Sequence, residues 1–237
     1  MKIRNTLTAI VAGLALAGGV QAADHGRAAA EPWTPGAWMN ALQSMPDGDV
    51  RRGEQLHGNM FCASCHGARG ESVSDNWPAL NGQRAEYTYK MLLDYKDARR
   101  QEDGRADIMV EIAQFLSEQD MADLAAFYAD QPLPEPRPRT LDDEQFAQVD
   151  KLVRQGDPTR LLTPCAACHG AKGEGGINET PALAGQVPDY FIRTMKAYRD
   201  GLRSNDVNKG MSQFAKPLTD EEIRLLAEYY ASMPTTD

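Results

Sequence analysis

Apolar residues recur at helical spacing along much of the chain, and no segment shows the apolar–polar alternation expected of a half-buried strand. Tyr87, Met91 and Tyr95 lie four residues apart and form one apolar stripe, which predicts a helix over residues 84–98. Because such spacing returns in both halves of the chain, we predict an all-α fold.

Capping residues and prolines predict further helices. Thr34 followed by Pro35 suits the start of a helix, and Asp49 suits the N-cap of another. Ser117 and Asp120 form a capping box for a helix that ends before Pro132. The shorter predicted helices span residues 36–45, 50–58 and 108–114, with a charged loop at 99–106, and the inward-facing residues of the capped helix are Met121, Leu124, Ala125 and Tyr128.

The second half of the chain repeats the first. The run Pro78-Ala-Leu-Asn-Gly-Gln returns 103 residues later as Pro181-Ala-Leu-Ala-Gly-Gln. The offset then falls to 102, and at that offset Met109 matches Met211. Two tandem copies of a helical domain of roughly ninety residues explain this pattern.

A proline-rich segment separates the copies. Four prolines fall within residues 131–140, which favours a semi-rigid, extended spacer. Trp33 and Trp38 lie in an extra N-terminal piece, where they either pack on the core or form a contact surface. The predicted division is a signal peptide at 1–22, an N-terminal extension at 23–48, a first domain at 49–131, a linker at 132–141 and a second domain at 142–237.

The N-terminus has the pattern of an export signal. Lys2 and Arg4 precede an apolar run that ends in the small-x-small sequence Val20-Gln21-Ala22, which predicts cleavage near Ala22; an uncleaved anchor is the alternative. Loss of two basic residues and no acidic one would move the net charge from −9 to −11. This acidity argues against a nucleic-acid partner and suits either steering toward a basic partner or simple solubility.

All four cysteines fall in two C-x-x-C-H motifs, Cys62-Ala63-Ser64-Cys65-His66 and Cys165-Ala166-Ala167-Cys168-His169. This is the attachment signature of c-type haem. Cysteines three apart on a helical turn point the same way, so both thiols can add to the two vinyl groups of one haem, while the histidine reaches the iron. A disulfide or a redox pair would leave both histidines unexplained, and a four-cysteine zinc site would leave the repeat unexplained.

Methionine is the best candidate for the second axial ligand. Met109 and Met211 are the only methionine pair that superimposes between the copies, and they follow His66 and His169 by 43 and 42 residues. The remaining histidines do not repeat: His25 lies in the N-terminal piece, and His57 is expected at the surface or in packing.

These ligands indicate a function in electron transfer. A thioether ligand is neutral and soft and favours ferrous iron, and an iron ligated on both sides has no open position for a substrate. We therefore predict an electron carrier and not an enzyme. Pro78 and Pro181 each lie 12 residues after the histidine. A carbonyl near them either accepts the histidine Nδ1–H or belongs to a turn.

Together, the motif, the proline, Leu-x-Gly-Gln, the tyrosine-bearing helix, the methionine and the Leu-Ala-x-Tyr-Tyr helix resemble class I cytochrome c. In duplicate they resemble the dihaem cytochrome c4 group, over about residues 49–233. The resemblance implies two covalent haem c groups, the axial pairs His66/Met109 and His169/Met211, proline carbonyls behind both histidines, a pseudo-twofold axis and a periplasmic location. The N-terminal extension and the proline-rich linker depart from the group's usual pattern.

The resemblance also implies redox partner proteins: a dehydrogenase or quinol-oxidising complex as donor and a terminal oxidase as acceptor, with membrane association only through such partners. The alternative function is the electron-accepting subunit of a periplasmic oxidoreductase, such as a sulfide or thiosulfate dehydrogenase. Its motivation is the segment carrying Trp33 and Trp38, as a docking surface. The third hypothesis, in which no haem is bound, is a zinc-binding interaction protein.

Overall fold

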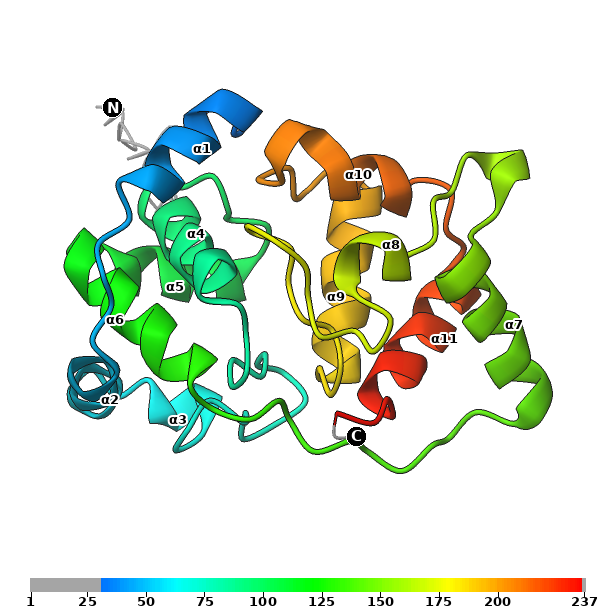
Figure 1. Ribbon diagram of the computed structural model, residues 1–237, viewed down its shortest axis with the longest axis horizontal. Coiled ribbons are helices and arrows are strands. Elements are labelled where there is room, and N and C mark those ends of the chain that lie inside the picture. Colours follow the sequence, from blue (N-terminus) through cyan, green and yellow to red (C-terminus); the bar gives the residue numbers. More distant parts are fainter. Residues whose placement is uncertain (1–30, 236–237) are drawn as a thin grey trace, which may run out of the picture.

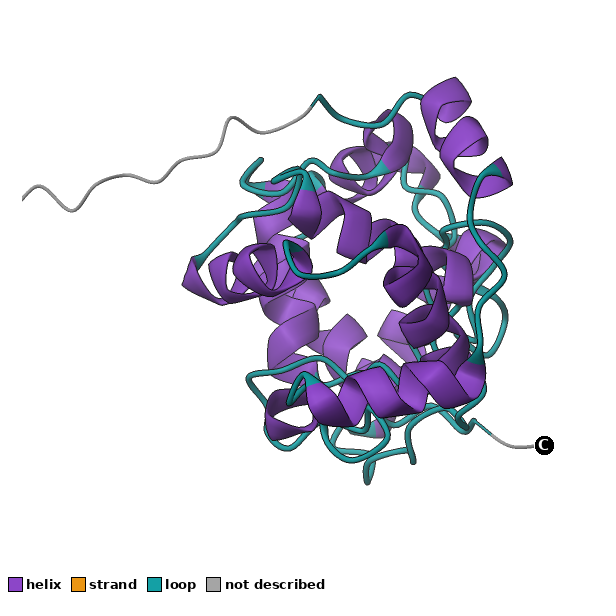
Figure 2. Cartoon of the chain, turned by 90° about the vertical axis from the view of Figure 1, so that its left-hand side faces the viewer, coloured by secondary structure: helices purple, strands orange, loops and turns teal. Residues whose placement is uncertain are grey.

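The computed structural model describes residues 31–235, so the predicted signal peptide and His25 lie outside the described residues. Every regular element in this range is a helix (Figure 2), as predicted. The first half contains α1 (Pro35–Gln43), α2 (Val50–Asn59), α3 (Ala63–His66), α4 (Ala85–Lys96), α5 (Gly104–Ala113) and α6 (Glu118–Ala129). The second half contains α7 (Asp143–Gln155), η1 (Pro158–Arg160), α8 (Ala166–His169), α9 (Pro188–Arg199), η2 (Val207–Lys209), α10 (Gly210–Ala215) and α11 (Asp220–Ala231).

The two halves form two bodies that lie side by side, and the linker between α6 and α7 passes along one edge of both (Figure 1). Each half has its own core. In the first, α2 and α4 pack on α6, and in the second, α7 and α9 pack on α11. The close approach of α2 to α6 requires a glycine at position 53, because a Cβ there would lie 2.1 Å from the Asp123 carbonyl oxygen.

Local capping fixes the helix starts. The Asp49 carboxylate accepts from the Arg52 amide, and Ser117 and Asp120 make the predicted capping box at α6. The predicted charged loop at 99–106 is wrong at its end, because Asp103 accepts from two backbone amides and starts α5 at Gly104, four residues earlier than predicted.

The domains meet across a seam built from the repeated Pro-Ala-Leu-x-Gly-Gln run. The Gln83 side chain donates to the Ala182 carbonyl (3.1 Å) and accepts from its amide (2.8 Å). Gln186 does the same with Ala79, at 3.0 and 2.9 Å. Each copy thus presents the same glutamine to the same backbone position of the other, as a pseudo-twofold relation requires.

The N-terminal extension bridges both domains. Trp38 is buried, and its Nε1 donates to Glu179 of the second domain (2.5 Å). Trp33 donates to Asp94 of the first domain, and its carbonyl accepts from the Asn208 amide of the second. Of the two predicted fates for these residues, the structure shows packing, which removes the reason for treating the segment as a docking surface.

Candidate haem sites

Both C-x-x-C-H motifs form a single helical turn. The His66 amide donates to the Cys62 carbonyl, and the His169 amide donates to the Cys165 carbonyl, both at 3.0 Å. No disulfide joins any of the four cysteines. Burial raises the pKa of the Cys62 thiol, and it raises that of Cys165 to about 11. The two motifs therefore present the same pair of sulfurs on the same turn.

The two histidines are held in the tautomer that a metal ligand needs. His66 Nδ1 lies 3.0 Å from the Pro78 carbonyl oxygen, and His169 Nδ1 lies 2.9 Å from that of Pro181. Because a carbonyl only accepts, each Nδ1 carries the proton and each Nε2 keeps a free lone pair. Burial lowers the pKa of both imidazoles and favours their neutral form. A role for the two prolines in a turn alone therefore does not account for these two hydrogen bonds.

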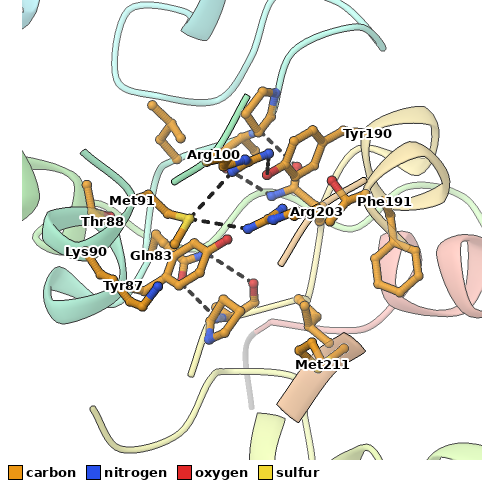
Figure 3. Close-up of a pocket in the computed structure, with 18 of the residues that line it drawn as sticks. Gln83, Tyr87, Thr88, Lys90, Met91, Arg100, Tyr190, Phe191, Arg203 and Met211 are labelled. Atoms are coloured by element: carbon orange, nitrogen blue, oxygen red, sulfur yellow. Dashed lines mark hydrogen bonds between the residues drawn. The ribbon is translucent and has the colours of Figure 1, made fainter. Parts of the chain in front are cut away.

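One cavity of about 390 Å³ joins the two motifs. It is lined by all eight residues predicted from the sequence: Cys62, Cys65, His66, Met109, Cys165, Cys168, His169 and Met211. Met211 approaches it from α10 (Figure 3). Met109 lies on the equivalent helix of the first half, α5. The fold thus brings each histidine and the matching methionine, more than forty residues apart in sequence, to one apolar space.

Two buried arginines lie in this cavity, and sequence reasoning missed them. Arg100 and Arg203 are 5% and 2% exposed, and both point at the Met91 sulfur in Figure 3, at 3.6 and 3.3 Å. Arg100 pairs with Glu102; although burial acts to raise the pKa of that carboxyl, the guanidinium lowers it to about 2. Arg203 keeps a buried Nη1 without a partner within the described residues. The repeat could have revealed them, because Arg100 and Arg203 are 103 residues apart, like the two C-x-x-C-H motifs.

These features fit a haem in each half. The unpaired thiols suit its vinyl groups, the histidine Nε2 and the methionine sulfur suit its iron, and the buried guanidinium groups suit its propionate carboxylates. A four-cysteine zinc site does not fit, because no three His, Cys, Asp or Glu side chains gather at a metal-binding distance anywhere in residues 31–235.

His57 is the third histidine of the described chain. It is 3% exposed, on α2, and packs against Phe127 and Tyr128 of α6. Of the two predicted fates, surface or packing, the structure shows packing. His57 does not line the cavity that holds His66 and His169.

Comparison with known proteins agrees with this geometry. The cytochrome c family model matches residues 50–132 and again residues 160–234. Cytochrome c4 from Thiocapsa roseopersicina is 37% identical over 184 residues, which cover 77% of this chain and 91% of the relative. The thiosulfate dehydrogenase electron acceptor of Stutzerimonas stutzeri is 33% identical over 175 residues, covering 73% and 79%.

Solved structures show the same arrangement. Reduced cytochrome c4 from Pseudomonas stutzeri superimposes with a TM-score of 0.69 at 28% identity, covering 79% of this chain and all of that one. Thiosulfate dehydrogenase from Marichromatium purpuratum gives the same TM-score and identity, covering 78% of this chain and 40% of that one.

The chain therefore belongs to the cytochrome c family, as a dihaem electron-transfer protein of the cytochrome c4 type. It binds two covalently attached haem c groups, one in each domain, and its electrons pass between redox partner proteins. Among the described helices, none is both long and apolar enough to cross a bilayer.

Proposed function

We propose that the protein carries single electrons in the periplasm, with its first haem held by Cys62, Cys65 and the axial pair His66/Met109. Cys165, Cys168 and the pair His169/Met211 hold the second. The observation that carries this proposal is the shared cavity, into which two oriented imidazoles and two repeat-matched methionines project.

The haem, when bound, supplies a one-electron ferric/ferrous couple. The protein's own residues would keep other ligands away from the iron and hold its surroundings in one arrangement. The Pro78 and Pro181 carbonyls hold both imidazoles in one orientation, and the methionine sulfur favours the reduced metal. With His66 and Met109 holding one iron and His169 and Met211 the other, no position would remain for a substrate, which supports a carrier over an enzyme.

The proposed domain boundaries follow the same division. The first haem domain spans residues 49–131 and the second 142–237, with a linker at 132–141. Asp49, the N-cap of α2, and the two separate hydrophobic cores support these limits.

The axial ligands are tested by M109A and M211A, made separately. Each variant should lose half of the far-red ferric band of methionine ligation, and the midpoint potential of one haem should fall, because a soft sulfur ligand is lost. M91L is the matched control: Met91 lines the same cavity but has Thr194 as its repeat counterpart, so the band should stay. An intact band in M109A or M211A would contradict the assignment for that domain.

The partners proposed are a dehydrogenase or quinol-oxidising complex as donor and a terminal oxidase as acceptor. A second candidate function is favoured by the relatives: two of them are named thiosulfate dehydrogenase electron acceptors, at 33% and 30% identity. In that function the protein would accept electrons from a thiosulfate-oxidising enzyme. Rapid reduction of the purified cytochrome by such an enzyme plus thiosulfate would support it; reduction only by a quinol-oxidising complex would support the carrier.

A periplasmic location is supported by the leader pattern in residues 1–22 and by the attachment of haem to cysteine. N-terminal sequencing of the exported protein should begin at Ala23. Cytoplasmic retention of the haem-loaded chain would contradict the proposal. The net charge of −9 supports protein partners over nucleic acid.

A further inference from the structure

Two buried arginines occupy equivalent positions in the two domains. Arg100 and Arg203 are 103 residues apart, as the C-x-x-C-H motifs are, and both line the cavity that joins the motifs. The Arg100 guanidinium lies over the Tyr95 ring, 4.9 Å from its centroid, and the Arg203 guanidinium lies over the equivalent Tyr198 ring, at 4.4 Å. The repeat therefore places one cation beside the same ring in each domain.

Each of these rings belongs to a core that also contacts a proposed axial methionine. Tyr95 lies in a cluster of buried residues against which Met109 packs, and Tyr198 lies in a cluster against which Met211 packs. Each arginine is thus associated with the haem site of its own domain.

The acceptor two residues after each arginine differs in charge between the domains. Arg100 Nε donates to Glu102 Oε1 at 3.0 Å, and Arg203 Nε donates to Asn205 Oδ1 at 2.8 Å. In the first domain, Arg100 Nη2 also donates to Glu102 Oε1, at 2.8 Å, which completes a two-point ion pair. The same hydrogen bond is therefore accepted by a carboxylate in one copy and by a neutral amide in the other.

The Glu102 carboxylate is ionised inside the protein. Its side chain is 6% exposed. Burial acts to raise its pKa, but the Arg100 guanidinium lowers it to about 2. At neutral pH, Arg100 and Glu102 together carry no net charge. Arg203 keeps its positive charge, and its buried Nη1 meets no acceptor in residues 31–235.

The contact between the domains explains why the second copy has no carboxylate at this position. Asn205 Nδ2 donates to Asp94 of the first domain at 2.6 Å. An aspartate at position 205 would bring two buried carboxylates together, where like charges repel strongly. A residue at this position therefore cannot neutralise Arg203 in the way that Glu102 neutralises Arg100.

We propose that Glu102 is a positioning residue that acts through Arg100: it cancels the arginine charge beside the first haem and so lowers the midpoint potential of that haem. Reduction adds one electron to the site, so a nearby positive charge favours the reduced form, and a carboxylate paired with that charge removes the effect. Arg203, whose partner is neutral, keeps this effect on the second haem. The inference rests on the haem sites proposed above.

The decisive variant is E102Q, measured by redox titration at neutral pH. Glutamine keeps the length of the side chain and an oxygen that accepts from Arg100, so the substitution removes the charge alone. The reduction equilibrium constant of the first haem should rise about threefold to tenfold, which is about 28 to 59 mV for a one-electron couple. The shift of the second haem should be less than half as large. The first haem is the one whose midpoint falls in M109A.

Two further variants separate the charge from other effects of the substitution. E102D keeps the carboxylate and should leave the first haem within about twofold in the same constant. E222Q is the matched control, because Glu222 accepts from Arg160 at 2.7 and 3.0 Å and neither of these residues lines the cavity. It removes the same charge from a two-point ion pair, and both haems should stay within about twofold.

Each outcome decides the proposal. A first midpoint that stays or falls in E102Q would overturn it, as would an equal rise at both haems or a rise in E102D as large as that in E102Q. Where E102Q does not fold, E102M removes the same charge and replaces it in the test; if neither variant folds, Glu102 is a structural residue and the proposal is overturned. A pyridine haemochrome assay first counts the haems: fewer than two in the unmodified protein would overturn the haem attachment itself, whereas two haems with an unmoved first midpoint overturn only the role of Glu102.

Discussion

Asp94 joins three parts of the molecule, and its removal should destabilise all three. Its carboxylate is fully buried and accepts from Lys90 Nζ (2.6 Å), Asn205 Nδ2 (2.6 Å) and Trp33 Nε1 (2.5 Å). These donors belong to the first domain, the second domain and the N-terminal extension. The second domain has Ala197 at the equivalent position, so D94A gives the first domain the same residue type that the second domain already has there.

The expected cost of D94A follows from the charge that it leaves behind. Lys90 is 1% exposed, and without Asp94 its ammonium keeps the Asn205 carbonyl oxygen (2.6 Å) as its acceptor within the described chain. Breaking a buried ion pair by removing one partner costs about 3 to 5 kcal/mol. In a protein of this size that corresponds to a fall of about 6 to 20 °C in melting temperature, measured by far-UV circular dichroism.

The pH dependence of this loss of stability tests whether the unpaired Lys90 charge causes it. Burial already lowers the pKa of Lys90 although Asp94 acts to raise it, so in D94A the pKa falls further. An amine whose pKa is depressed by folding binds more protons in the unfolded chain, so stability rises with pH. The deficit of D94A should therefore shrink between pH 7 and pH 9.

The matched control removes both charges. K90M/D94A leaves no stranded ammonium, and it should recover most of the loss, because apolar replacements of a buried ion pair are often close to neutral. If K90M/D94A melts at the same temperature as D94A, the stranded charge is not the cause, and the reasoning is refuted.

Other predictions concern the seam, the extension and the second domain. Q83A and Q186A should each destabilise the domain contact by about 2 to 5 kcal/mol in calorimetry, since each orphans a buried amide and carbonyl; unequal losses would contradict the pseudo-twofold seam. W38F should cost about 1 to 3 kcal/mol by leaving the Glu179 carboxylate unpaired, while E179Q, which keeps an acceptor, should cost less. The pKa of Asp157 is lowered to about 2 by hydrogen bonds from the neighbouring hydroxyl and guanidinium, so its contribution is complete above about pH 4 and is lost toward pH 2. D157N should flatten acid unfolding in that window.

Features that depend on neighbours in sequence could be predicted without the structure. Asp49 and Ser117 start their helices through hydrogen bonds within three residues, and the C-x-x-C-H turn closes on itself. The repeat also singles out Met109 and Met211 as candidate ligands, because they are the only methionine pair that matches between the copies. One local signal was missed: Asp142 and Gln145 form a capping box that starts α7.

Features that depend on the contact between domains could not be predicted. Lys90 and Asp94, four residues apart on a helix, have the pattern of an exposed ion pair, yet both are buried because Asn205 of the other domain covers them. Arg100 falls in a segment that reads as a charged loop, and it is buried beside Tyr190 of the second domain. Nothing in the local sequence states which surface of one copy meets the other, so burial of these charges follows only from the assembled pair.

Departures from the repeat show where the two domains differ. Residues that match between the copies, such as Gln83 with Gln186, serve needs that both sites share, namely ligation and docking. Buried polar residues without a polar counterpart lie in both domains: His57 and Asp94 in the first, and Ser212, which matches Val110, in the second. An unmatched polar group in a core costs desolvation that an apolar residue avoids, so its presence in only one copy needs a cause beyond stability. His57 lies behind the haem-binding turn, Asp94 fixes the domain contact and Ser212 bonds Asp206, so each departure from the repeat is satisfied by hydrogen bonds of its own domain or of the contact between the domains.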